Sequence, residues 1–242
     1  MAKANLFDAG VQLVKQTIPD FEIRYKNESW SSKVLAVLVW IFNRDYLKKY
    51  TTTRYPRVYF PSREFVSGNT TRAFKILMHE FVHLWDRKSK GWFRFTLGYL
   101  FPQILALVFL VLLVVALVAP TPGPVAWIKW VVVAVLGIGT LVSVAPLPAP
   151  LRTKLELRGY AMNLAVNFWR HGSIRESSFD WIIPKFTGWD YYRMWPYEND
   201  VRRRLVNLKL AIEDGRIRHE DQEGGTAIPY ALVEDLIKDL DK

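Results

Sequence analysis

Two long uncharged stretches, separated by a proline-rich turn, constrain this chain more than any other feature. Residues 97–118 contain no charged side chain, and as one helix they would extend about 33 Å, enough to cross the hydrocarbon core of a bilayer. Residues 125–145 carry only Lys129, whose long side chain can reach the membrane interface. The alternative is a buried hairpin in a soluble protein, but no other segment is large enough to cover it. We therefore predict a two-helix transmembrane hairpin within residues 97–146.

The residues that flank the hairpin predict its orientation. Aromatic side chains, which favour the membrane interface, lie just before or at the start of both stretches: Trp92, Phe93, Phe95, Tyr99, Trp127 and Trp130. Basic side chains lie before the first stretch and after the second, and the turn has none: Arg87, Lys88, Lys90, Arg94, Arg152, Lys154 and Arg158. The positive-inside rule places both flanks in the cytoplasm. We expect an integral protein of a bacterial-type cytoplasmic membrane, with the lipid bilayer as partner and both termini cytoplasmic.

A short motif within residues 75–87 indicates a chemistry. His79, Glu80 and His83 form the pattern His-Glu-x-x-His. On a helix, positions i and i+4 share a face, so both imidazoles can reach one metal ion, and the glutamate is placed to take a proton from a metal-activated water. The alternative is two surface histidines on an ordinary helix. It is disfavoured because the surrounding residues are almost all apolar, which predicts a buried helix whose polar groups need a partner.

The composition limits the ligands that such a metal can have. The chain contains no cysteine, so disulfides and thiolate sites are excluded and the ligands must be His or carboxylate. Catalytic zinc takes three protein ligands and keeps one position for water. We choose Glu156 as the third ligand, because it lies on the first helix after the hairpin, which returns the chain to the side that it left. His171 and His219 are rivals in polar surroundings, and a surface Glu156 paired with Arg152 or Arg158 is the alternative.

The rest of the chain is expected to be mostly helical with a small β element, which is an α+β fold. Periodicity predicts helices at residues 4–17, 34–42, 71–88, 151–170, 199–212 and 228–240, the second of them in the core. Residues 20–25 and 50–61 predict short strands, the latter at a sheet edge because of Pro56. An edge strand beside a metal helix can pair with a substrate backbone; a plain hairpin that covers the core is an equal alternative.

These elements divide into four predicted regions. Residues 1–96 form the N-terminal part of the catalytic domain with the His-Glu-x-x-His helix, and residues 97–146 form the hairpin. Residues 147–215 form the C-terminal part with the third-ligand helix, and residues 216–242 form a linker and a terminal helix. Residues 178–197 are dense in aromatic side chains. Core packing is favoured for them, while contact with lipid or the lining of a cleft stays open.

The order of these parts resembles that of a known family. A His-Glu-x-x-His helix, two membrane spans and a helix with a glutamate are similar, over roughly residues 70–170, to the HtpX-like and CAAX-prenyl-endopeptidase membrane gluzincins. The resemblance implies a zincin-like fold and a zinc endopeptidase with a cytoplasmic site. It makes His79, His83 and Glu156 the ligands of Zn²⁺ and Glu80 the general base. The first 70 residues lack the membrane helices usual in that family, which suggests a short, divergent member.

One position departs from the family pattern. Such gluzincins commonly carry Asp four residues after the ligand Glu, where it orients a metal-bound His, but this chain has Tyr160 there. Asp86, three residues past His83 on the same face, is expected to take over that role. Alternatively, Tyr160 acts in catalysis by donating a hydrogen bond to a ligand or to the tetrahedral intermediate. The candidates for stabilising the oxyanion are Tyr160, Tyr191, Tyr192 and Arg193.

The expected activity is the hydrolysis of a peptide or protein substrate. The alternative is an inactive, membrane-anchored zincin-like protein, whose structural metal is closed by a fourth ligand such as His171 and whose C-terminal region docks a partner. The formal net charge of +10 also suits binding to nucleic acid. No nucleic acid is expected, however, because the basic residues crowd the flanks of the hairpin.

Overall fold

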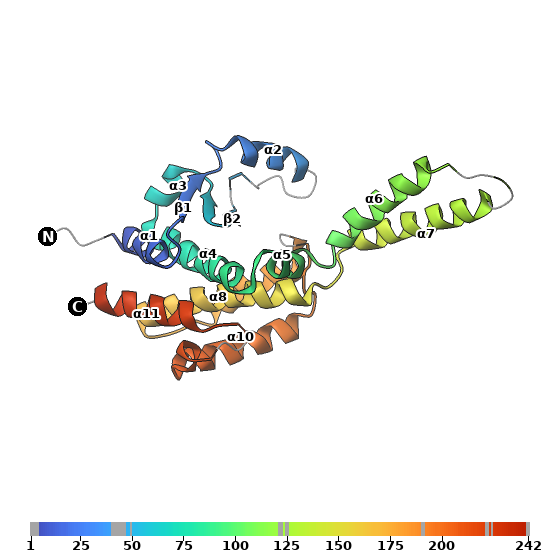
Figure 1. Ribbon diagram of the computed structural model, residues 1–242. Coiled ribbons are helices and arrows are strands. Elements are labelled where there is room, and N and C mark those ends of the chain that lie inside the picture. Colours follow the sequence, from blue (N-terminus) through green and yellow to red (C-terminus); the bar gives the residue numbers. More distant parts are fainter. Residues whose placement is uncertain are drawn as a thin grey trace.

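The computed structural model describes residues 5–39, 47–48, 50–120, 123, 126–189, 192–220, 223 and 225–240. Its helices are α1 (Leu6–Thr17), α2 (Trp30–Val39), α3 (Arg63–Ser67), α4 (Thr70–Lys90), α5 (Trp92–Leu100), α6 (Ile104–Val118), α7 (Ala126–Val144), α8 (Pro150–His171), α9 (Ser177–Thr187), α10 (Glu198–Glu213) and α11 (Ile228–Leu240), with a 3₁₀ turn η3 (Arg216–Arg218). The strands are β1 (Glu22–Tyr25), β2 (Thr52–Arg54) and β3 (Arg57–Phe60). The fold is thus mostly helical with a small sheet, as predicted (Figure 1).

Two long helices, α4 and α8, lie side by side at the centre of the globular part (Figure 1). α4 begins where Asn69 Oδ1 accepts the amide of Arg72 at 2.8 Å, and it ends at Gly91, whose φ of 79° favours glycine. α8 begins with Pro150 in its first turn and ends at Gly172 in the left-handed conformation. The sequence-based ranges of both helices are confirmed to within two residues.

Apolar packing on both sides fixes α4 against α8. α1 packs on α4, whereas α10 and α11 pack on α8 (Figure 1). Gly10 of α1 allows a close approach to α4, because a Cβ there would lie 2.8 Å from the ring of Phe74. The fully buried side chains that α4 and α8 contribute to the core include Phe74, Leu77, Met78, Phe81, Leu84, Leu157, Ala161, Met162 and Ala165. The two helices are therefore held as a rigid pair by burial of apolar surface.

The three-stranded sheet places an edge strand beside α4. The strand order is β1–β3–β2, with β1 parallel to β3 and β2 antiparallel to it. Val58 of β3 is opposite Ile23 of β1 and Thr53 of β2, and its side chain is fully buried. β2 has a partner on one side only and contacts α4. The edge position predicted for residues 50–61 is confirmed for β2.

The hairpin is present as two packed helices, but its first helix is shorter than predicted. α6 begins at Ile104, and residues 97–100 belong to α5, which makes an angle of 90° with α6. Pro102 lies at the break, and because it has no amide hydrogen it interrupts a continuous helix. The prediction of one unbroken helix over residues 97–118 is therefore wrong. Among the described helices, α7 is long and apolar enough to cross a membrane, and α5 with α6 qualifies only as one broken span.

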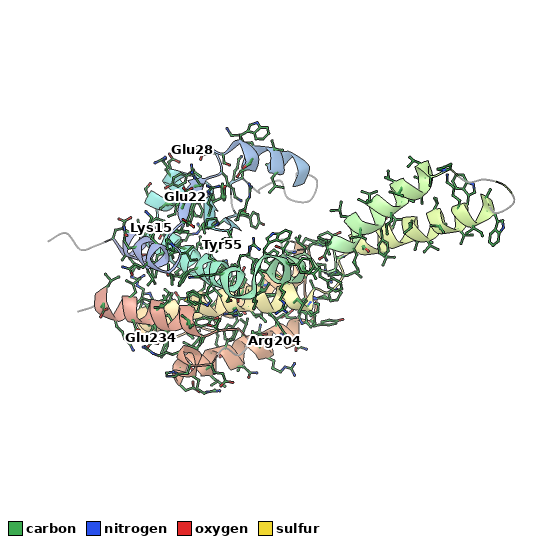
Figure 2. The ribbon with its side chains drawn as sticks, in the orientation of Figure 1. Lys15, Glu22, Glu28, Tyr55, Arg204 and Glu234 are labelled. Carbon is green, nitrogen blue, oxygen red and sulfur yellow. The ribbon has the colours of Figure 1, made fainter. Side chains whose placement is uncertain are left out.

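Many apolar side chains of the hairpin are exposed to solvent, which is unusual for apolar residues (Figure 2). The two helices pack on each other, but the rest of their apolar surface has no covering element (Figure 1). The large apolar side chains exposed on α6 and α7 include Leu107, Val111, Val115, Val131, Val135, Ile138 and Leu141. A soluble monomer rarely exposes a contiguous apolar surface of this kind.

Two further expectations differ from the structure. Residues 34–42 are expected in the core, but Val34 is 39% exposed; the side chains of residues 37–42 lie outside the described residues. Arg54 of β2 donates hydrogen bonds to Ser31 and Ser32, so the start of α2 has a polar contact with the sheet. In residues 178–197, the side chains divide: Phe179 and Phe186 are buried, whereas Trp181, Trp189 and Tyr197 are exposed.

Candidate metal centre

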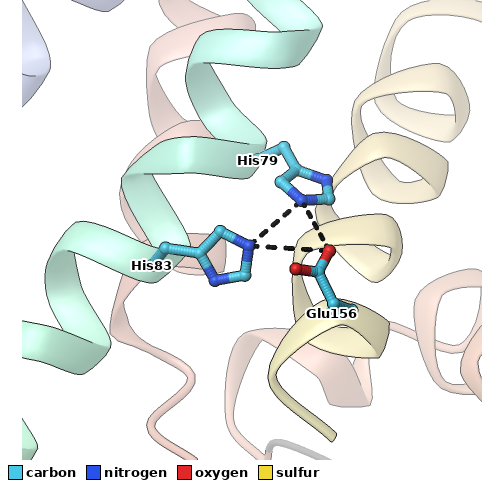
Figure 3. Close-up of side chains that lie close together, drawn as sticks. All are labelled: His79, His83 and Glu156. Carbon is cyan, nitrogen blue, oxygen red and sulfur yellow. Dashed lines mark hydrogen bonds and ion pairs between the residues drawn. The ribbon is translucent and has the colours of Figure 1, made fainter. Parts of the chain in front are cut away.

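Three side chains from α4 and α8 converge on one point (Figure 3). His79 and His83 lie one turn apart on α4, and their Nε2 atoms are 3.1 Å apart. Glu156 of α8 places its Oε2 atom 3.6 Å from His79 Nε2 and 3.9 Å from His83 Nε2. All three side chains are buried. The structure thus brings together the three predicted ligands in a group that could hold a metal ion.

The spacing of these atoms suits a tetrahedral metal ion. Ligand atoms about 2.05 Å from a zinc ion lie about 3.3 Å from one another in tetrahedral geometry. The observed separations of 3.1, 3.6 and 3.9 Å lie close to that value. Two imidazole lone pairs and a carboxylate oxygen that face one another in a buried space cost free energy unless a cation lies among them. The donor set therefore fits a metal by both distance and charge.

The electrostatics of the group keep its carboxylate ionised. Burial raises the pKa of Glu156, but the hydrogen bond from His79 and the charges of His83 and Arg152 outweigh it and lower the pKa to about 2. Burial lowers the pKa of His83 below its usual value. Burial also acts to lower the pKa of His79, yet its hydrogen bond to Glu156 and the charge of Glu80 raise that pKa overall. At neutral pH Glu156 is thus a carboxylate, the form that binds metal.

Two residues of α8 support the ring of His79. The amide nitrogen of Asn163 lies 3.3 Å from His79 Nδ1, and Asn163 Oδ1 is buried without a hydrogen-bond partner among the described residues. The oxygen and nitrogen of an Asn amide occupy similar volumes, so the Asn163 amide can be rotated by half a turn without a change in packing. In that orientation Oδ1 accepts a hydrogen bond from the Nδ1–H of His79, which leaves His79 Nε2 free to bind a metal. A Cβ on Gly159 would lie 2.4 Å from His79 Nε2, so glycine is needed for this close approach.

Tyr99 of α5 orients the carboxylate of the third ligand. Its hydroxyl donates a hydrogen bond of 2.6 Å to Glu156 Oε1, so that Oε2 faces the two imidazoles. The ring of Tyr99 stacks on Phe95, and the guanidinium of Arg152 lies 5.0 Å from its centroid. The sequence assigned Tyr99 to an interfacial belt. No local pattern reveals its contact with a residue 57 positions away.

Glu80 is held by the edge strand. Thr53 of β2 donates its hydroxyl to Glu80 Oε2 at 2.6 Å. Unlike the three ligand residues, Glu80 is only partly buried, and it lines a cleft together with His79 and Tyr160. Lys26, just after β1, is fully buried. Burial lowers the pKa of Lys26 to about 7, although the negative charge of Glu80 acts in the opposite direction.

No hydrogen bond joins Asp86 to a ligand histidine among the described residues, and Asp86 Oδ2 and His83 Nδ1 are both buried without a partner there. Asp86 is fully buried and forms ion pairs with Arg158 of α8 and, at 3.0 Å, with Lys90. Arg158 also donates to the carbonyl of Thr226, which ties the segment before α11 to this pair. Asp86 therefore braces α4 against α8. The residue beside a ligand imidazole is instead Asn163, seven positions after Glu156 and so on the same face of α8.

The other sequence-based candidates separate into those at the cleft and those remote from it. Tyr160 lines the cleft, and its ring centroid lies 4.9 Å from that of His79. His171 also lines the cleft, but it is exposed and does not belong to the metal group. His219 is exposed as well, and it belongs neither to the metal group nor to the cleft lining. Tyr192 donates its hydroxyl to the carbonyl of Val144 at the end of α7, so this segment lies at the base of the hairpin. Tyr192 and Arg193 are not among the described residues that line the cleft, and Tyr191 lies outside the described residues.

The cleft beside the metal group has a volume of about 1010 Å³ and is walled by α4, α8 and α9. Comparison of the chain with protein-family models, with curated proteins and with solved structures found no match. The geometry itself defines the class of site: a buried His-His-Glu group beside a partly exposed carboxylate, with His79 and that carboxylate lining a cleft.

Proposed function

We propose that this protein is a membrane-anchored zinc metallopeptidase of the gluzincin type, similar to the HtpX-like and CAAX-prenyl-endopeptidase enzymes. The observation that supports it most is the convergence of His79, His83 and Glu156 next to Glu80 on a cleft. Two imidazoles and a carboxylate, with no thiolate, are a ligand set of catalytic zinc. Among the described residues the group contains three such side chains, which leaves a position for water, whereas a structural zinc site has four protein ligands.

The residues around the site can carry out peptide hydrolysis. A zinc ion held there would polarise the scissile carbonyl and lower the pKa of a water molecule. Glu80 takes the proton of that water, because Thr53 binds one carboxylate oxygen and leaves the other oxygen for the proton. When the C–N bond breaks, Glu80 delivers the proton to the leaving amine. Tyr160, at the cleft and beside His79, is the candidate donor to the oxyanion.

The proposal includes a membrane anchor built from α5, α6 and α7. The apolar side chains that α6 and α7 expose are the surface that a bilayer would cover. Basic residues flank the hairpin on both sides, which favours a site on the cytoplasmic side. This anchor would hold a soluble catalytic part at the membrane surface.

The test measures metal and turnover separately on the detergent-purified full chain. We expect about one zinc ion per wild-type chain, lost in His79→Ala and in Glu156→Ala. Glu80→Gln should retain the zinc but lose hydrolysis of a quenched-fluorescence peptide library by a factor of about 10³ or more. Glu220→Gln, an exposed residue without an ion pair among the described residues, is the matched control and should behave like wild type.

Two outcomes would contradict the proposal. Hydrolysis by Glu80→Gln at the wild-type rate would remove the general base from the mechanism. A wild-type chain without zinc after reconstitution, or with zinc but without hydrolysis of any peptide, would favour a membrane-anchored binding protein instead.

A further inference from the structure

The cleft that leads away from the metal group is lined by positive charge. Its fixed cations are Arg72 and Lys75 on α4, Arg175 before α9 and Lys185 on α9, whereas Glu80 is the sole carboxylate among the described lining residues. Several arginines elsewhere on the surface are paired with carboxylates, as Arg63 is with Glu28 at 2.8 Å. Within the described part of the chain, no carboxylate lies within ion-pair distance of Arg72, Lys75 or Arg175.

A neighbouring group adds to this excess of charge. Lys75 is partly buried, and burial together with the positive charge of Arg170 lowers its pKa. Arg170 Nη1 is itself buried without a hydrogen-bond partner among the described residues. Cations that lose hydration without gaining a counter-charge are destabilised, and a ligand that brings negative charge into the cleft would relieve this cost.

We propose that this cleft binds peptide carboxylates, so that the substrate is an acidic segment of a polypeptide. The proposal rests on the peptidase function and names its substrate class. Neutral side chains beside the cations can bind the peptide backbone; they are Asn163, Asn167, Ser177 and Ser178. The cations supply the preference for acidic residues, and His79 and Glu80 line the same cleft.

The spacing along α4 predicts where the acidic residues lie. Lys75 and Arg72 precede His79 by four and seven residues, which is a rise of about 6 and about 10 Å along the helix. An extended peptide advances about 3.3 Å per residue. Acidic side chains two and three residues from the scissile bond would therefore lie beside these cations.

The position of the cleft favours a polypeptide over an anionic lipid. The hairpin leaves after the C-terminal end of α4 and returns at the N-terminal end of α8 (Figure 1). The cations of α4 belong to the opposite end of that helix, since Lys75 precedes Lys90 by about 22 Å of helix. A lipid headgroup at the base of the hairpin would not reach them, whereas a soluble segment would.

Binding of matched peptides to zinc-loaded Glu80→Gln protein tests this assignment without turnover. The peptides are short, fluorescent and built from Gly, Ala and Leu, and they differ only at two adjacent positions, Asp-Asp or Asn-Asn. By fluorescence anisotropy we expect the Asp-Asp peptide to bind about tenfold more tightly, because it gains two charge pairs. The preference should fall as the salt concentration rises from about 0.05 M to about 0.5 M.

Charge variants locate the binding site. Added to Glu80→Gln, the pair Lys75→Gln and Arg175→Gln should remove the preference for Asp-Asp. The matched control is the pair Lys33→Gln and Arg203→Gln, two exposed cations outside the cleft lining, which should leave the preference unchanged. Both peptides carry a C-terminal amide, so a preference for Asp-Asp reports binding of side-chain carboxylates alone.

Three results would overturn the inference. They are equal binding of the two peptides, an Asp-Asp preference that survives the cleft variants, and displacement of the peptide by a single-stranded oligonucleotide at lower concentration than by unlabelled Asp-Asp peptide. The results that would reject the peptidase function differ from those that would reject the cleft assignment. Hydrolysis without an acidic preference rejects only the cleft assignment, and acidic binding without hydrolysis by the wild type rejects only the enzyme.

Discussion

At the scale of single residues, Gly159 decides whether His79 can face the other ligands. The helix backbone of α8 lies against the imidazole, with 2.4 Å between His79 Nε2 and the position of an added Cβ. We expect Gly159→Ala to displace this ring and to lower the affinity for zinc at least tenfold, measured by competition with a chelator. Gly137→Ala on α7 is the control, since a Cβ there meets nothing within 4 Å. Equal zinc affinity in both variants would mean that the ring does not depend on this approach.

The same scale separates what the sequence could predict about the site from what it could not. His79, Glu80 and His83 follow from a local pattern, and Glu156 follows from the return of the chain after the hairpin. Asn163, Tyr99 and Thr53 could not be assigned, because their roles depend on which faces of distant elements meet. Asp86 has the spacing expected of a residue that orients His83, but Arg158 competes for its carboxylate, and sequence spacing does not show competitors.

At the scale of elements, α5 connects the hairpin to the metal centre. It meets α6 at 90°, and Trp92 and Phe93 at its start are 65% and 66% exposed. If α6 enters a bilayer, α5 lies along the interface, where aromatic side chains are favoured. Its other end carries Tyr99, the hydrogen-bond donor to Glu156. Hydropathy alone predicts one helix over the uncharged residues 97–118, because it does not show that Pro102 separates α5 from α6.

This connection can be tested with a single hydroxyl. Tyr99→Phe keeps the ring that stacks on Phe95 but removes the donor to Glu156 Oε1. We expect the zinc affinity to fall by about tenfold to a hundredfold, with little change in the thermal unfolding midpoint of the metal-free protein. Tyr197→Phe, at a half-exposed ring on Trp195, is the control. An unchanged zinc affinity for Tyr99→Phe would show that the carboxylate is oriented without α5.

At the scale of the whole molecule, the two helices of the hairpin differ in length, which matters for the proposed insertion into a membrane. The 19 residues of α7 extend about 28 Å, close to the hydrocarbon thickness, whereas the 15 residues of α6 extend only about 22 Å. A bilayer can thin locally to match a short helix. Lys129 donates to the carbonyls of Leu117 and Ala119, so the far end of the hairpin is a polar tip suited to the opposite interface.

The absence of cysteine from the chain makes this crossing directly measurable. Pro120→Cys puts one thiol at the tip of the hairpin, and Glu220→Cys puts one on the globular part, both at exposed positions. In spheroplasts, we expect a membrane-impermeant maleimide to label the Pro120→Cys variant from outside, because the positive-inside rule predicts a cytoplasmic location for the basic residues that flank the hairpin. The Glu220→Cys variant should react only after lysis. If both variants react only after lysis, α6 and α7 enter the bilayer from one side and return without crossing it, and the short α6 would then be the physical reason.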